Sequence, residues 1–454
     1  MQKATRSVRY DGVSDPIGAV PADMGAPAVP AVPADMGSPT GRPAGAAQGY
    51  GDGVIGPSGP LTISAPRLLV RGRLTGPGAV TLEDGRIASV RRGVPPAGPQ
   101  HVRMDRGVLT PGLLDLQNNG SFGVDFAEAS PQEWEQTRRQ LARRGVTGVQ
   151  PTLITAPLPY LNAAFDRCAA AADAAAGLPL SRILGVHLEG PFLSEARRGA
   201  HRADWLCDPT PHAIDTLLSH PATQRMLRTL TLAPERDGAM EAIRQLAAGG
   251  VIVSVGHTDA TAEQVGAAAD AGASMVTHLF NAMRPFRHRD PATPGEVLTD
   301  PRYFVGLIVD GYHVSPITCR LVYAAAPGRV VAVTDAIVTA GLPNGTSLSF
   351  GGGPVANDET GLGRRPDGTI AGAGIVLDEG VRRLVAAGID PAEVLASATE
   401  VPARSLGCSD VGHLQPGAHA DLVWWDDFFR PLRVWIGGQP VPTAPGPAER
   451  AVNC

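Results

Sequence analysis

The stretch RILGVHLEGP, residues 182–191, contains the pattern that decides the fold. An apolar run of strand length ends on Glu189, and the Gly190-Pro191 dipeptide stops the strand immediately afterwards. Short apolar runs that alternate with helical patterns are typical of βα units in a parallel sheet. This stretch therefore predicts one strand of such a sheet, with a carboxylate at its end.

The same kind of run occurs eight times in the chain, and Ala-rich helical patterns such as PQEWEQTRRQLARRG lie between the runs. Eight units over about 220 residues match the size of a closed (β/α)₈ TIM-like barrel. An open doubly wound sheet is the alternative, but the Gly-rich dinucleotide fingerprint is missing after the first run. The predicted strands cover residues 111–117, 148–154, 182–188, 227–233, 251–256, 273–278, 304–309 and 329–334.

Both flanks of the predicted barrel, which covers residues 110–404, differ from it. Residues 61–109 and 405–445 hold short β patterns with Gly and Asp-Gly turns, which predict one small β-sandwich-like domain built from both chain ends. Residues 1–60 are rich in Pro, Gly and Ala, and VPADMGAP recurs there as VPADMGSP. That composition buries too little apolar surface to offset the entropy of ordering, so we interpret it as a disordered extension.

Composition narrows the class of protein. Among 454 residues, 43% are hydrophobic and the net charge is −5, which indicates neither a nucleic-acid partner nor an anionic membrane partner. No apolar run approaches the ~20 residues of a membrane span. The five cysteines lack C-x-x-C spacing, which argues against disulfides and a thiolate zinc site. The start, MQKATRSVRYDG, has no apolar stretch typical of a secretory signal, so we expect a cytoplasmic protein.

The predicted strands end in a series of polar residues. In a (β/α)₈ barrel the carboxyl ends of all strands meet at one face, where the active site lies. Histidines and carboxylates from five or more strands would therefore converge there. The residues at these ends are Asp115, Gln117, Asn119, His187, Glu189, His257, His278, Asp310, His313 and Asp335.

Glu189, His257 and His278 form a set of one oxygen and two nitrogen donors that suits zinc or a similar divalent ion such as Fe, Mn or Co. Three protein ligands leave one position open, as in catalytic sites. Any one of them alone is better explained as a hydrogen-bonded core or loop residue, whereas three at successive strand ends favour a metal. Asp335 is the candidate general base. The alternative is that its carboxylate only caps the start of the segment that follows.

At these residues the chain resembles the N-acetylglucosamine-6-phosphate deacetylase family of the amidohydrolase superfamily. The matching motifs are TPGLLDLQNNGSFGVDF, GVHLEGPFLSEARRGAH, SVGHTDA, VTHLFNAM, VDGYHV, VVAVTDA and DGTIAGAG, which follow one another from Thr110 to Gly374. HLEGPF together with THLFNAM is specific, whereas GHTDA alone is a weak signal. The flanking β segments match as well, so the resemblance covers nearly everything beyond residue 60.

The resemblance implies a role for each matching residue. Glu189, His257 and His278 correspond to the metal ligands, Asp335 to the catalytic aspartate and His201 to a histidine that polarises the substrate carbonyl.

Other positions correspond to contacts with the sugar and its phosphate group. Asn281 and Ala282 would lie near the phosphate, and His313 would contact the substrate. Arg289 corresponds to an arginine that reaches the neighbouring site of a homodimer, although its RHRD context is equally typical of a solvated loop.

The number of metal ions follows from the first strand. Many amidohydrolases carry H-x-H there, but this chain has Gln117 and Asn119, whose amides are poor zinc ligands. These are therefore vestigial second-metal positions, and we predict one divalent ion per subunit.

The resulting functional prediction is metal-dependent hydrolysis of the acetamide of N-acetyl-D-glucosamine 6-phosphate, which yields glucosamine 6-phosphate and acetate. The first alternative is a deacetylase of the galactosamine epimer, because no residue distinguishes the two sugars. A second is another amidohydrolase reaction, although such relatives retain H-x-H and a carboxylated lysine. The third, a non-catalytic sugar-phosphate sensor, would require loss of a ligand or of the base.

Overall fold

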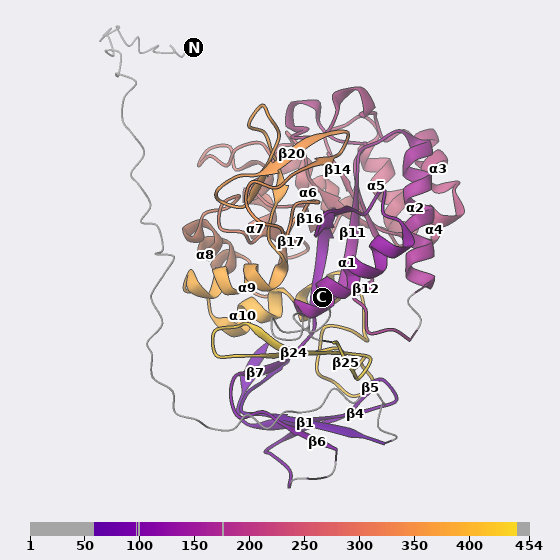
Figure 1. Ribbon diagram of the computed structural model, residues 1–454. Helices are drawn as coiled ribbons and strands as arrows, with labels where there is room; N and C mark the ends of the chain where they lie inside the picture. The colour runs from indigo at the N-terminus through magenta and orange to yellow at the C-terminus, as the bar shows by residue number, and fades with distance from the viewer. Residues whose placement is uncertain (1–58, 97, 99, 175–176, 443–454) are drawn as a thin grey trace, which may run out of the picture. The chain divides into compact units, whose positions relative to one another are not determined.

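The structure is a computed structural model that describes residues 59–96, 98, 100–174 and 177–442 (Figure 1). All but the last two residues of the predicted disordered extension, 1–60, lie outside this range. No helix among the described residues is both long enough and apolar enough to cross a bilayer.

Eight parallel strands form the predicted barrel, and each contains the core of one predicted apolar run. In order around the sheet, β8 pairs with β11, and β11 is followed by β13, β14, β15, β16, β17 and β18. The prediction of a TIM-like barrel is thus confirmed. The strands are β8 (Leu113–Asn118), β11 (Val146–Ile154), β13 (Val186–Glu189), β14 (Leu227–Leu232), β15 (Ile252–Val255), β16 (Met275–Val276), β17 (Phe304–Ile308) and β18 (Val330–Val333), with the two-residue β12 (Arg182–Ile183) beside β11.

The seam between β18 and β8 joins at the carboxyl ends of the two strands. The backbone N–H of Asp335 donates to the carbonyl oxygen of Gln117 at 2.9 Å, and Asn118 and Ala336 form a parallel bridge. This closure brings residues from the first and last strands together at one end of the barrel.

Helices surround the strands in Figure 1. Several begin at strong caps, as in the capping boxes of Ser130 with Glu133 and of Thr261 with Gln264. The helices are α1 (Pro131–Arg143), α2 (Leu158–Asp173), α3 (Pro211–Leu218), α4 (Pro221–Met226), α5 (Ala239–Ala248), α6 (Ala262–Ala271), α7 (Ala292–Thr299), α8 (Pro316–Ala325), α9 (Leu377–Ala386), α10 (Pro391–Ser397) and α11 (Glu400–Ser405), with the 3-10 turns Glu195–Arg197 and Ala203–Trp205.

Two further sheets lie outside the barrel: all strands of the first come from residues 61–103, whereas the second combines strands from both flanks. One has the order β5-β4-β1-β6 and the other the order β25-β24-β23-β7-β2-β3. In the second sheet β7 pairs antiparallel with β23, so that Thr110 faces Val423. We propose that residues 61–109 and 405–445, of which 443–445 lie outside the described residues, form one discontinuous domain. The strands are β1 (Leu61–Ala65), β2 (Leu68–Val70), β3 (Arg73–Thr75), β4 (Gly78–Glu83), β5 (Arg86–Arg92), β6 (His101–Arg103), β7 (Val108–Pro111), β23 (Leu422–Trp425), β24 (Pro431–Ile436) and β25 (Gln439–Pro440).

An antiparallel sheet that the sequence did not predict follows β18. Its strands are β19 (Ser347–Phe350), β20 (Gly353–Asn357), β21 (Leu362–Arg364) and β22 (Ile370–Ala373), and a shorter hairpin, β9 (Gly120–Ser121) with β10 (Val124–Asp125), follows β8. In Figure 1, β20 lies at the end of the barrel away from β7 and β24.

Candidate active site

Glu189 is buried at the end of β13, and two imidazoles converge on its carboxylate. Its Oε1 lies 3.1 Å from Nε2 of His257 and 3.0 Å from Nε2 of His278. The two Nε2 atoms lie 3.1 Å from each other. One oxygen and two nitrogens from three different strand ends therefore form a nearly equilateral triangle.

This triangle fits a divalent cation. Ligand atoms about 2.0–2.1 Å from a tetrahedral ion lie roughly 3.4 Å apart, close to the spacing observed. Nδ1 of His257 lies 2.9 Å from the carbonyl oxygen of Arg197, which can only accept, so that Nδ1 carries a proton. In the neutral ring Nε2 is then an acceptor that faces an acceptor oxygen of Glu189. A cation between them would turn this repulsion into ligation.

Burial alone would raise the pKa of Glu189, but the hydrogen bonds and positive charge that His257 and His278 supply when both ring nitrogens are protonated outweigh it and hold that pKa well below its usual range. The carboxylate is therefore charged at neutral pH, as a metal ligand requires.

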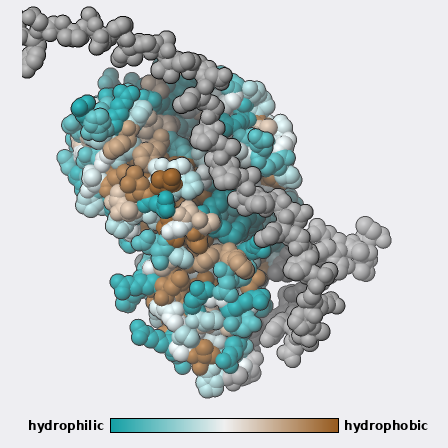
Figure 2. All heavy atoms as spheres, turned by 90° about the vertical axis from the view of Figure 1, so that its left-hand side faces the viewer, coloured by the Kyte–Doolittle hydropathy of each residue, from teal (hydrophilic) through white to brown (hydrophobic). Residues whose placement is uncertain are grey.

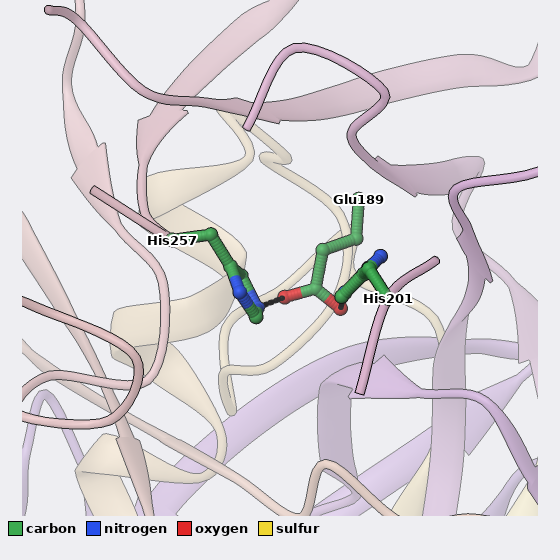
Figure 3. Close-up of side chains that lie close together, drawn as sticks. All are labelled: Glu189, His201 and His257. Atoms are coloured by element: carbon green, nitrogen blue, oxygen red, sulfur yellow. Dashed lines mark hydrogen bonds and ion pairs between the residues drawn. The ribbon is translucent and has the colours of Figure 1, made fainter. Parts of the chain in front are cut away.

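His201 approaches the same carboxylate from the other side, and Figure 3 shows Glu189 between His201 and His257. Nε2 of His201 lies 4.0 Å from Oε2 of Glu189, and its Nδ1 lies 2.9 Å from the hydroxyl of Thr155. Burial, followed by the charge of His257, lowers the pKa of His201 to about 3, so its ring is neutral. Glu189, His201 and His257 also form a group within 4.8 Å, but the set containing His278 is tighter.

Three of these strand ends have left-handed backbone. His257, His278 and Asp335 have φ values of 47°, 29° and 50°. Such a conformation costs a residue with a Cβ about 1–2 kcal/mol, and it persists mainly at functional sites, where surrounding contacts enforce it. The turn at each strand end carries the side chain into the mouth of the barrel.

Asp335 is buried beside this cluster. Its Oδ1 accepts hydrogen bonds from Nε2 of Gln117 at 3.2 Å and from Nδ2 of Asn119 at 3.0 Å. Burial, together with the negative charge of Glu189, raises the pKa of Asp335 to about 7. That value suits a group which must accept and release a proton near neutral pH.

Gln117 and Asn119 act as donors at the positions that sequence analysis interpreted as vestigial for a second metal. Nε2 of Gln117 also donates to Oε1 of Glu189 at 3.3 Å, so one amide links the two carboxylates. An N–H group offers no lone pair to a cation. The amide of Gln117 thus contacts both carboxylates, and that of Asn119 contacts Asp335.

A cavity of about 300 Å³ opens next to these groups, which suits a ligand the size of a phosphorylated sugar. Asn281, Ala282 and His313 line it, as the resemblance implied. Nδ1 of His313 lies 2.5 Å from Asp310, which leaves Nε2 available to a ligand. Arg289 is exposed and does not line the cavity of its own chain.

His187 also belongs to the polar residues predicted at the strand ends, but it lies inside the barrel and not in the candidate site. Its two ring nitrogens bond to the hydroxyls of Thr152 and Thr231 inside the barrel, and burial lowers its pKa to about 4. Its environment is that of a neutral, hydrogen-bonded core residue.

Sequence reasoning missed the part of the cavity wall that comes from the β19–β22 sheet. Phe350, Ile370, Ala371 and Gly372 line the cavity there. These are apolar residues in a Gly-rich segment, and only the motif DGTIAGAG pointed to that region.

The comparisons with known proteins agree on one family. The model of the amidohydrolase family matches residues 108–441. The N-acetylgalactosamine-6-phosphate deacetylase of Escherichia coli O157:H7 is 36% identical over 79% of this chain and 93% of that protein. The N-acetylglucosamine-6-phosphate deacetylase of Homo sapiens is 36% identical over 81% of this chain and 89% of that protein.

Solved structures are similar as well. A variant of the N-acetyl-D-glucosamine-6-phosphate deacetylase from Mycobacterium smegmatis, in complex with N-acetyl-D-glucosamine-6-phosphate, has a TM-score of 0.78 and 33% identity. The match covers 85% of this chain and all of that one.

Proposed function

This chain belongs to the amidohydrolase family, and from that premise we propose that it hydrolyses the acetamide of N-acetyl-D-glucosamine 6-phosphate to glucosamine 6-phosphate and acetate. One observation carries the proposal: the triangle of Glu189, His257 and His278 lies beside the carboxylate of Asp335 in a single cavity. Relatives that act on phosphorylated N-acetylhexosamines support the substrate class.

Glu189, His257 and His278 would hold one divalent ion per subunit, with zinc the first candidate and Fe, Mn or Co the others. Such an ion, when bound, supplies a Lewis acid that polarises a carbonyl and makes water more acidic. A metal analysis of purified protein should give one ion per chain, and two per chain would contradict the proposed role of the amides of Gln117 and Asn119.

Asp335 accepts the proton of the water that attacks the acetyl carbonyl, and it then delivers this proton to the leaving nitrogen. Gln117 and Asn119 hold one oxygen of the carboxylate and so orient the other toward the cavity. His201 polarises the acetyl oxygen. When the hydroxyl of Thr155 donates to Nδ1 of this neutral ring, the ring proton lies on Nε2, the atom nearest Glu189.

The sugar and its phosphate would contact Asn281, Ala282 and His313 of the same chain, with Arg289 supplied by a second copy. An exposed apolar surface supports such a homodimer. Figure 2 shows brown residues on the face that carries α7, α8 and α9. The large apolar residues exposed in this part of the chain are Phe286 (54% exposed), Tyr312 (52%), Ile317 (71%) and Leu321 (59%).

We further propose that the protein is located in the cytoplasm.

A second candidate substrate is N-acetyl-D-galactosamine 6-phosphate. The similar relatives include deacetylases named for either epimer. Turnover of the two epimers under identical conditions separates these candidates.

The test of the whole proposal is acetate release from N-acetyl-D-glucosamine 6-phosphate and from the unphosphorylated sugar. We expect the phosphorylated sugar to be hydrolysed with a kcat/KM at least tenfold higher. Equal rates on both sugars would contradict the claim that the enzyme recognises the phosphate group. If neither phosphorylated epimer released acetate, the proposed deacetylase activity would be wrong.

A further inference from the structure

Arg365 follows β21 in the sheet that covers one side of the cavity, and its guanidinium lies in a space made by glycines. Nη2 donates to the carbonyl oxygen of Ala200 at 3.4 Å. A Cβ added to Gly353 would lie 2.7 Å from Nη1, and one added to Gly351 would lie 3.3 Å from Nη2. Any larger residue at Gly353 would therefore force the guanidinium to shift.

The hydrogen-bonding capacity of Arg365 is mostly unused. Within the described ranges it forms no ion pair with a carboxylate, and its buried Nε has no hydrogen-bond partner. The adjacent Arg364 differs, because its Nε donates to Asp358 at 2.6 Å and its Nη1 donates to Gly368 at 3.0 Å. A guanidinium carries five N–H donors and keeps its charge at any physiological pH. Among the described residues, the carbonyl oxygen of Ala200 is thus the one acceptor of the Arg365 side chain, and most of its N–H donors remain available.

The position of this cation relates it to the cavity. Ala200, to which it donates, lines the cavity next to His201. The preceding residue, Gly199, lies against the candidate site, since a Cβ there would be 3.3 Å from Cε1 of His257 and 4.0 Å from Cβ of Ala282. Arg365 is not itself a lining residue, but its guanidinium reaches Ala200, whose neighbour Gly199 lies beside Ala282, one of the expected phosphate contacts.

A second arginine lies on the same short segment. Nη1 of Arg198 donates to the carbonyl oxygen of His201 at 2.8 Å, and within the part of the chain that the structure describes it also has no carboxylate partner. Two guanidiniums on consecutive carbonyl groups raise the positive potential at this wall. An anionic group of a ligand would be attracted there.

We propose that Arg365 is a specificity-determining residue that binds the phosphate group of the substrate from within the same subunit. The inference rests on the proposed function, which supplies a substrate whose only formal negative charge is its phosphate. A planar guanidinium fork matches phosphate oxygens and forms short, charge-assisted hydrogen bonds with them. This contact is independent of Arg289, which can act only in a dimer.

The experiment compares three variants of the full chain in its metal-loaded form. Arg365→Gln removes the charge at similar size, and Arg365→Lys keeps the charge without the fork. Arg364→Gln is the matched control in the same hairpin, since it removes an arginine that already has a partner. For each, kcat/KM is measured on N-acetyl-D-glucosamine 6-phosphate and on N-acetyl-D-glucosamine.

We expect Arg365→Gln to lower kcat/KM on the phosphorylated sugar by about 10- to 100-fold, mainly by raising KM. The kcat/KM on the unphosphorylated sugar should change by less than about twofold. Arg365→Lys should fall between this variant and wild type. Arg364→Gln should preserve the wild-type ratio between the two sugars. Equal losses on both sugars for Arg365→Gln would mean that it braces the hairpin or contacts sugar hydroxyls, and would overturn the proposal.

Calorimetric titration with inorganic phosphate separates this inference from the proposed function. If wild type hydrolyses neither sugar, the deacetylase proposal fails, but phosphate should still bind at least fivefold more weakly to Arg365→Gln than to wild type or Arg364→Gln. Equal phosphate affinity in all three proteins would overturn the role of Arg365, whatever the enzyme hydrolyses.

Discussion

Replacement of Asp335 by Asn tests the proton transfer at the centre of the proposed reaction. Asn has the same shape, and its amide oxygen can still accept the hydrogen bonds from Gln117 and Asn119. What the substitution removes is the oxygen that can take a proton from water. A positioned general base contributes about 10²- to 10⁴-fold to a rate, or roughly 3–5 kcal/mol of activation free energy.

We therefore expect Asp335→Asn to lower kcat for acetate release by about 10²- to 10⁴-fold, with KM changed by less than about threefold. Bound metal should stay at the wild-type level, because Asp335 is not one of the three atoms of the triangle. The assay is acetate release at saturating substrate, with metal content measured on the same preparation.

Asp125→Asn is the matched control. Burial raises the pKa of Asp125 to about 6, so it too is a buried carboxylate with a raised pKa, but it does not line the cavity. We expect its kcat within about threefold of wild type. An Asp335→Asn enzyme that retains more than a tenth of the wild-type kcat would refute the assignment of the base, and so would a loss of metal that accounts for the lost activity.

Three other predictions concern the metal, the pH dependence of stability and the dimer. Glu189→Gln removes the charged ligand, so metal content and acetate release should fall together to under about a tenth of wild type; a variant that retains its metal would contradict the ligand set. Burial holds the pKa of His187 at about 4 in the folded protein, whereas the ring of the unfolded chain takes a proton below about pH 6.5. The neutral ring therefore contributes its full stabilisation above about pH 6.5, and this contribution declines as the pH falls toward 4. Between pH 7 and pH 5, wild type should lose about 2 kcal/mol more unfolding free energy than His187→Asn in urea titrations, and equal losses would show that the ring is not held neutral. Ile317→Glu combined with Leu321→Glu should convert a wild-type dimer into monomers in sedimentation, and a monomeric wild type would remove the proposed role of this surface.

The sequence alone determined the order of the βα units and the position of the chemistry along the chain. Apolar runs of strand length, alternating with helical patterns, predicted the eight barrel strands, because a parallel strand buried on both faces is mainly apolar. Glu189 could be assigned to the mouth of the barrel because Gly190-Pro191 ends its strand. The rule that parallel strands place their carboxyl ends on one face then grouped Glu189 with His257, His278 and Asp335.

The same reasoning could not separate His187 from Glu189, since both have the same parity on β13. Tertiary contacts separate them: hydroxyls of β11 and β14 bind His187 inside the barrel, whereas Glu189 faces His257 and His278. Similarly, no pattern predicted that the segment after β18 forms a sheet beside the cavity, because its apolar and glycine residues carry no chemical signature.

Only the tertiary structure decided how the strand-end side chains meet. His257, His278 and Asp335 have left-handed backbone, and the enrichment of His and Asp in this conformation is too weak to predict it at these three positions. The amide of Gln117 reaches Asp335 across 218 positions of sequence, and it does so only because the barrel closes between β8 and β18. The sequence sets which chemical groups are available, whereas their distances arise from backbone turns and long-range contacts that exist only once the chain has folded.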